Sequence, residues 1–169
     1  MKKDDSGIQY TSQQLFSLTI LRVLIGWHFL YEGLVKLWSE PAWTSKAYLM
    51  GSVGPAAPLF KTIAASQLLL NITDKLNIWG LVLIGLSLFT GLFCRYFKIF
   101  GIFLLLLYYA AYPPFASLGA KFPAEGSYWI VNKNLIEMAA LFVLFLFPTS
   151  QITGLDYFLL RSRKGELPV

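Results

Sequence analysis

The chain contains four long apolar segments, and their length constrains the fold more than any other feature of the sequence. Each reaches, with its flanks, the roughly 20 residues that an α-helix needs to cross a bilayer. Of the 169 residues, 56% are hydrophobic and 14% are charged, whereas about 25% of a typical soluble domain is charged. We therefore expect an all-α, polytopic membrane protein, a four-helix bundle that forms a single domain over residues 1–169, with helices at about 15–38, 76–94, 98–113 and 131–148.

The connections between these segments differ greatly in length. The short stretch "RYFK", Arg95 to Lys98, separates the second segment from the third and predicts a tight helical hairpin. The connection between the first and second segments is long and covers about 39–76. Apolar residues recur in it at a helical spacing, which predicts a short amphipathic helix at the membrane surface. These residues are Phe60, Ile63, Ala64 and Leu68.

Basic residues lie mostly at the ends of the apolar segments. This placement explains the net charge of +5 as a matter of topology, so we expect no nucleic-acid partner. An even number of spans brings both ends of the chain and the short connection to one side. The positive-inside rule then predicts a multi-pass protein of the plasma (inner) membrane with both termini in the cytoplasm. The residues that carry this argument are Lys2, Lys3, Arg95, Lys98, Arg161, Arg163 and Lys164.

Cysteine and histidine are scarce, which limits the chemistry of the chain. Cys94 is the only cysteine and His28 the only histidine. A lone cysteine forms neither an internal disulfide nor a CxxC redox pair, and one histidine does not supply a metal cage. We expect no metal site and no cofactor held within the chain, and we interpret Cys94 as a packing residue.

The first apolar segment, "LRVLIGWHFLYEGLVKLW", carries four ionisable side chains. A charge at the bilayer centre costs about 2.5–3.5 kcal/mol on insertion scales, so we expect these side chains to turn inward. At about 100° per residue they share a face with two glycines, where another helix can approach closely. The residues of this face are Arg22, Gly26, His28, Glu32, Gly33 and Lys36, and the opposite, lipid-facing side holds Val23, Leu24, Trp27, Leu30, Tyr31 and Leu34.

Polar residues of two further helices are expected at the same depth. If the first helix runs outward, Glu32 and Lys36 lie in its outer third, and the fourth helix begins there with Asn134 and Glu137 on one face. The third helix brings Tyr108, Tyr109 and Tyr112 to the same level. The candidate ligand or ion-pair cluster consists of Arg22, His28, Glu32, Lys36, Asn134 and Glu137, with Arg22 alone on the inner side.

Two interpretations of this cluster stay open. In the first, the polar groups line a pocket that opens to the outer leaflet, because intramembrane ionisable residues are functional candidates by default. In the second, Lys36 pairs with Glu137 or Glu32, and such ion pairs only hold the bundle together. His28 taken alone is more typical of a satisfied core histidine than of a ligand.

Three motifs in order resemble the DoxX-like family of membrane proteins. The first helix has the pattern of an arginine, helically spaced glycine and phenylalanine, and Gly-x-x-Lys-Leu; its residues are Arg22, Gly26, Phe29, Gly33, Lys36 and Leu37. The second segment is similar to the family's second helix at Gly85, Gly91 and Arg95. "VNKNLIEMAALFVLFLFP" resembles the fourth-helix motif of the DoxD-type branch, with Asn134, Leu135 and Glu137.

The resemblance covers nearly the whole chain and implies a four-helix integral membrane protein. Some family members are similar to the small subunit of a thiosulfate:quinone oxidoreductase, and others are associated with redox or assembly partners. A related branch uses cysteines, and this chain departs from it because it has only Cys94. The resemblance therefore supports the fold more strongly than any particular chemistry.

The sequence favours two functions of different classes. The first is an integral membrane subunit of a quinone-linked redox assembly, accessory to a partner that supplies the electrons. It would bind a quinone head group between Glu32, Lys36, Asn134 and Glu137. The second is a non-catalytic scaffold that holds another membrane or periplasmic protein through the apolar outer loop "AWTSKAYLMGSVGPAAPLF". A solute transporter is a weaker idea, since the sequence shows no inverted repeat and no broken helix.

Overall fold

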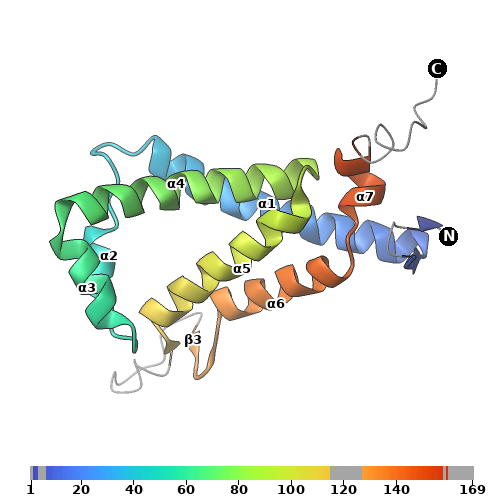
Figure 1. The fold of residues 1–169 in the computed structure, drawn as a ribbon. Helices are drawn as coiled ribbons and strands as arrows, with labels where there is room; N and C mark the ends of the chain where they lie inside the picture. Colours follow the sequence, from blue (N-terminus) through green and yellow to red (C-terminus); the bar gives the residue numbers. More distant parts are fainter. Residues whose placement is uncertain (1, 4–6, 115–126, 158, 160–169) are drawn as a thin grey trace.

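The computed structural model describes residues 2–3, 7–114, 127–157 and 159 (Figure 1). It is mainly helical. The elements are β1 (Lys2–Lys3), β2 (Gln9–Tyr10), α1 (Ser12–Leu37), α2 (Lys46–Met50), α3 (Ala57–Ala65), α4 (Gln67–Thr90), α5 (Cys94–Ala111), β3 (Ser127–Tyr128), β4 (Val131–Asn132), α6 (Lys133–Leu146) and α7 (Ser150–Thr153). The strands form two antiparallel pairs, β1 with β2 and β3 with β4. The C-terminal basic residues of the topology argument, Arg161, Arg163 and Lys164, lie outside the described residues.

Three helices in the described part of the chain are long and apolar enough to cross a membrane. They are α1, α4 and α5, with 26, 24 and 18 residues. They indicate a membrane protein, as the composition predicts. The 14 residues of α6 rise only about 21 Å, less than the roughly 30 Å of a hydrocarbon core. A fourth span and a surface helix therefore stay predictions.

Small residues bring α1 and α4 into close contact over much of their length. A Cβ atom added at Gly26 would lie 2.6 Å from the backbone nitrogen of Phe89, and one at Gly85 would lie 2.3 Å from that of Leu30. Gly33 meets Val82 of α4 in the same way. The glycine face predicted on the first helix thus packs on α4, because only glycine leaves room for a neighbouring backbone at this distance.

The turn between α4 and α5 lies earlier than the sequence suggested. Gly91 ends α4 in the left-handed region with φ 78°, the conformation in which glycine commonly terminates helices. Phe93 follows with φ 53°, and α5 begins at Cys94. The stretch Arg95 to Lys98, expected to form the connection, is therefore the first turn of α5, and the second and third helices begin at 67 and 94 rather than at 76 and 98.

The fourth apolar segment is shorter as a helix than predicted. Residues 131–132 pair in the β3–β4 hairpin, and Asn132 caps α6 by accepting a hydrogen bond from the Leu135 backbone N–H at 3.0 Å. At the other end, Pro148 disfavours a helical conformation for Phe147, and α6 ends at Leu146. Similarly, the first helix begins at Ser12, three residues before the expected 15, because Thr11 and Gln14 form a capping box.

The connection between α1 and α4 contains two short helices, α2 and α3. Phe60 and Ala64 of α3 are buried with Leu49, Leu70 and Ala111 in a small apolar core. The sequence grouped Leu68 with Phe60 and Ala64. In the structure the extended Ser66 separates α3 from α4, so Leu68 belongs to α4, where it is exposed. The predicted amphipathic stretch is thus divided between two elements.

The long helices give the molecule two distinct ends (Figure 1). We call the end that carries α2, α3 and the β3–β4 hairpin the distal end, and the end where α1 begins and α7 lies the proximal end. A contact of 3.0 Å between the hydroxyl oxygens of Thr19 and Thr153 ties α7 to α1. The main core lies between α1, α4, α5 and α6 and consists of Ile25, Phe29, Leu81, Ile84, Leu88, Cys94, Leu105, Leu141 and Leu144.

Candidate functional site

The inner face of α1 agrees with the sequence prediction only in part, because Arg22, Gly26 and Gly33 are buried whereas His28 is exposed. The helix buries Leu15, Arg22, Ile25, Gly26, Phe29 and Gly33, whereas Leu24, Trp27 and Tyr31 are exposed. The middle of this buried face lies near Arg22, and His28 is turned about 120° away from it. His28 is therefore placed at the margin of the face, where α1 meets α6 rather than α4.

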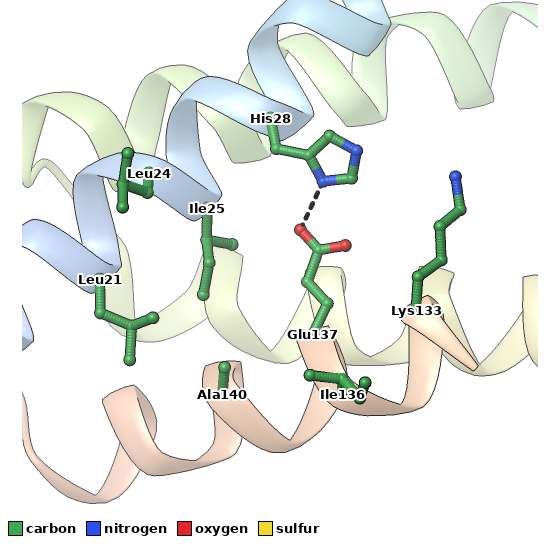
Figure 2. A pocket seen from close by; sticks show the side chains of 8 residues that line it. All are labelled: Leu21, Leu24, Ile25, His28, Lys133, Ile136, Glu137 and Ala140. Atoms are coloured by element: carbon green, nitrogen blue, oxygen red, sulfur yellow. Dashed lines mark hydrogen bonds and ion pairs between the residues drawn. The ribbon is translucent and has the colours of Figure 1, made fainter. Parts of the chain in front are cut away.

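An ion pair joins α1 to α6 across this margin (Figure 2). The Nδ1 atom of His28 lies 2.7 Å from Oε1 of Glu137. The Glu137 side chain is 12% exposed and that of His28 is 45% exposed. The pair is therefore accessible from the His28 side. An ion pair that only holds two helices together would not need this access.

A shallow, widely open groove of about 370 Å³ runs beside this pair, between α1 and α6 (Figure 2). Its polar end holds His28, Glu137 and Lys133, and the remainder is apolar. The apolar lining consists of Leu21, Leu24, Ile25, Ile136 and Ala140. Such a groove can hold an amphiphile, with a polar head at one end and a hydrocarbon portion along the other.

Lys133 is a site residue that sequence reasoning missed. It opens α6, one turn before Glu137, and its side chain extends along the same side of the helix (Figure 2). Residues four apart on a helix share a face, so the sequence "KNLIE" contained the signal. Of these two residues, the predicted cluster contains only Asn134, an amide three residues before Glu137.

Asn134 does not join the groove. The groove residues of α6 are Lys133, Ile136, Glu137 and Ala140, at the spacing of a single helix face, and Asn134 is turned about 100° from Lys133. Its half-buried side chain makes no hydrogen bond to any residue that the structure describes. The sequence placed Asn134 correctly on the first turn but could not fix which face of α6 meets α1.

Glu32 and Lys36 pair with each other instead of with Glu137. The Nζ atom of Lys36 lies 2.8 Å from Oε2 of Glu32, one turn earlier on α1. The same ammonium group lies 5.4 Å from the centre of the Trp43 ring. Of the two partners expected for Lys36, the structure shows Glu32, and the pair lies outside the groove lining.

Arg22 belongs to a different, proximal cluster. Its side chain is 2% exposed, and Nη1 lies 3.5 Å from the hydroxyl oxygen of Thr149. Its buried Nε has no hydrogen-bond partner among the described residues. Lys98 of α5 is 1% exposed and donates to the backbone oxygen of Leu144 at 2.8 Å. The sequence counted Lys98 as a topology signal at the membrane surface, and its burial corrects that interpretation.

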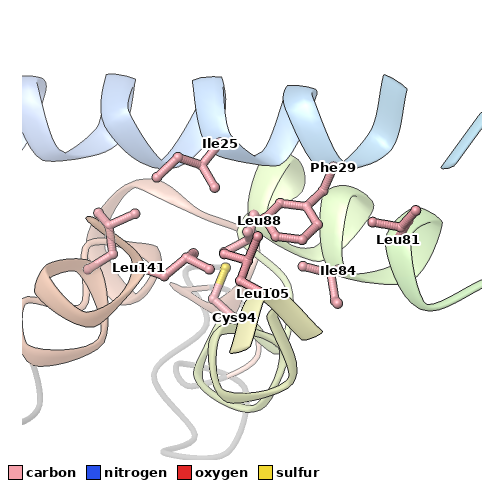
Figure 3. Close-up of a cluster of buried hydrophobic side chains, with 9 residues drawn as sticks. Ile25, Phe29, Leu81, Ile84, Leu88, Cys94, Leu105 and Leu141 are labelled. Carbon is pink, nitrogen blue, oxygen red and sulfur yellow. The ribbon is translucent and has the colours of Figure 1, made fainter. Parts of the chain in front are cut away.

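Cys94 lies beside these two cations and in the main core (Figure 3). Its thiol donates to the backbone oxygen of Ser87 at 3.1 Å, and the side chain is fully buried. Asp156 accepts a hydrogen bond from the Phe93 backbone N–H at 2.7 Å, just before α5 begins. The arrangement places Cys94 in a packing role, as expected.

The tyrosines at the distal end of α5 form a third group. The Asn77 side chain donates to the hydroxyl of Tyr108 at 2.6 Å, and Tyr112 donates to the backbone oxygen of Tyr48 at 2.8 Å. Tyr48 lies on α2, and partial burial next to the phenols of Tyr108 and Tyr112 raises the pKa of its hydroxyl. These contacts fasten α4 and α2 to the distal end of α5, and none of these residues lines the groove.

Comparison of the chain with protein-family models, with curated proteins and with solved structures found no match. The groove and its residues therefore define the candidate site on physical grounds alone.

Proposed function

We propose that the protein is an integral membrane subunit of a quinone-linked redox assembly and that the α1–α6 groove binds the quinone head group. The observation that carries this proposal is the groove itself, which is polar at one end, apolar along the rest and open on one side. A quinone has the same division, with two carbonyl oxygens on a ring and an isoprenoid tail.

The polar end offers the groups that a quinone head requires. Lys133 and a protonated His28 can donate hydrogen bonds to carbonyl oxygens. Glu137, at 2.7 Å from Nδ1 of His28, fixes the orientation of the imidazole ring and can pair with it when it is protonated. This assignment keeps Glu137 as a proposed head-group contact and replaces Glu32, Lys36 and Asn134 by His28 and Lys133.

The redox partner would be a separate membrane or periplasmic protein. Quinone reduction takes two electrons and two protons, and the side chains that line the groove are not redox-active. The chain would therefore be accessory to an oxidoreductase subunit that delivers the electrons, while the groove positions the quinone and supplies protons.

The same proposal includes the orientation of the chain in the inner membrane and its membership of the DoxX-like family. The start of α1 and α7 share the proximal end, where Arg95 is exposed, and this favours a cytoplasmic proximal end by the positive-inside rule. With α6 as a fourth span in the inner membrane, the distal end would face outward. The buried Arg22 and the packed Gly26 and Gly33 give the DoxX-like first-helix residues a structural role.

Neutralising the groove carboxylate should weaken quinone binding. We expect Glu137→Gln to lower the affinity for a short-chain ubiquinone analogue by roughly tenfold, because the variant no longer supports the charged imidazole of His28. The measurement is a ligand titration of the full chain in nanodiscs. Glu32→Gln is the matched control, since it removes an intramembrane carboxylate that pairs with Lys36 outside the groove. Equal affinities for Glu137→Gln and the unchanged chain would refute the proposal.

The scaffold function has an observation of its own. Met50, Val53 and Leu59, in the connection that carries α2 and α3, are exposed apolar residues. If this surface holds a partner, replacing these three residues by serine abolishes recovery of the partner from membranes, whereas Glu137→Gln leaves recovery unchanged. The opposite result, with recovery depending on the groove and not on the loop, would eliminate the scaffold.

A further inference from the structure

The β3–β4 hairpin at the distal end presents a short run of exposed apolar side chains. Its two strands pair antiparallel and are joined by Trp129 and Ile130. Tyr128, Trp129 and Ile130 are 67%, 75% and 61% exposed, the highest exposures of any three consecutive large apolar residues in the described chain. We call these three residues the hairpin tip.

The hairpin is held firmly although its side chains are exposed. The hydroxyl of Tyr109, near the distal end of α5, donates to the backbone oxygen of Ile130 at 2.8 Å. On the other side, Asn132 ends the hairpin and caps α6. Trp129 adopts φ 59°, a left-handed conformation that side chains rarely take and that persists where the surroundings impose it. The tip is thus a defined surface.

The length of α6 indicates what surrounds this surface. At about 1.5 Å per residue, α6 falls about 9 Å short of a hydrocarbon core of roughly 30 Å. With α6 as the fourth span of the proposed function, on which this inference rests, the missing length has to be supplied at an end of α6, and the hairpin continues α6 at its distal end. Through the Tyr109 bond the tip also lies at the distal end of α5, a candidate span whose exposed apolar residues include Phe103, Leu106 and Leu107.

We propose that the hairpin tip inserts into the interface of the distal membrane leaflet and completes the apolar length of α6. Tyrosine and tryptophan are the residues enriched at membrane–water interfaces. A backbone can enter that region only if its polar groups are satisfied, which the strand pairing and the Tyr109 bond achieve for part of the hairpin. Lys133 begins α6 on the bilayer side of the tip, and its long side chain can extend the ammonium group outward to the lipid head groups.

The test measures the depth of a spin label in liposomes of phosphatidylethanolamine and phosphatidylglycerol. Nitroxides are attached to Trp129→Cys, to Phe103→Cys as the lipid reference and to Lys61→Cys as the aqueous reference, all in the full chain. Collisions with oxygen report lipid exposure, and collisions with a water-soluble nickel chelate report water exposure. The unchanged chain, whose only cysteine is the buried Cys94, gives the background labelling.

We expect the label at position 129 to collide with the chelate roughly threefold less often than the label at 61, while its oxygen collisions match those at 103. Chelate collisions as frequent as those at 61 would overturn the proposal, because the tip would then lie in water. Protection from both quenchers would also overturn it, in favour of a protein surface over the tip. As a second measurement, Trp129→Phe should keep the hairpin in place and Trp129→Asp should raise the chelate accessibility of a label at Tyr128→Cys.

Discussion

Replacing Gly85 by alanine should destabilise the protein strongly, whereas the same change at Gly80 should not. The added Cβ at Gly85 would lie 2.3 Å from the backbone nitrogen and 2.6 Å from the Cα atom of Leu30, so α1 and α4 would have to move apart. Overpacking of this kind costs about 1–3 kcal/mol, and here the obstacle is backbone that cannot change its rotamer. The measurement is the thermal midpoint of the detergent-solubilised chain.

Gly80 is a matched control on the same helix. A Cβ added there meets no heavy atom of the described residues within 4 Å. Because alanine is favoured over glycine in a helix by up to about 1 kcal/mol, Gly80→Ala should leave the midpoint unchanged or raise it. Equal midpoints for the two variants would show that α1 and α4 are not packed as closely as the structure has them.

Removing the Asp156 carboxylate should destabilise the fold. Asp156 accepts the Phe93 N–H at 2.7 Å, and its charge acts on the buried Arg22 and Lys98. In Asp156→Ala the start of α5 loses its acceptor and the two cations lose their nearby negative charge. We expect a loss of about 1–3 kcal/mol in the free energy of unfolding, measured by denaturation in mixed micelles.

Asp156→Asn separates the two contributions. The amide oxygen can still accept the Phe93 N–H, but the negative charge is gone. If capping dominates, Asp156→Asn recovers most of the stability lost in Asp156→Ala. If neutralisation of Arg22 and Lys98 dominates, the two variants are equally unstable. A stability of Asp156→Ala equal to that of the unchanged chain would contradict both contributions.

The sequence of the first helix predicts part of its buried face and one ion pair, but not which residues of α6 meet it. The helical period alone brings Arg22, Gly26 and Gly33 to one face, and the structure buries all three. The period also brings Lys36 within one turn of Glu32, a local pair that needs no other helix. The predicted cluster contains Asn134 beside Glu137, whereas Lys133 lines the groove, because a sequence gives the spacing of residues on α6 but not the rotation of α6 about its axis.

The burial of cations in the proximal cluster also could not be predicted from the sequence. Lys98 and Arg95 stand three residues apart, and composition gives no reason to treat them differently. The position of the α4–α5 turn at Gly91 shifts both residues into α5, and the packing of α6 then buries Lys98 against Leu144 while Arg95 stays exposed. Burial of one cation and exposure of the other follow from where the turn lies.

The sequence by itself determined the class of this protein and the inner face of its first helix, since both depend on local quantities: the length of apolar runs and the period of about 3.6 residues per turn. Only the tertiary structure decided that His28 pairs with Glu137, that Lys133 completes the groove and that Arg22 and Lys98 are buried together. Those pairings depend on the rotation and register of one helix against another, which are set by many side-chain contacts at once and by no single stretch of sequence.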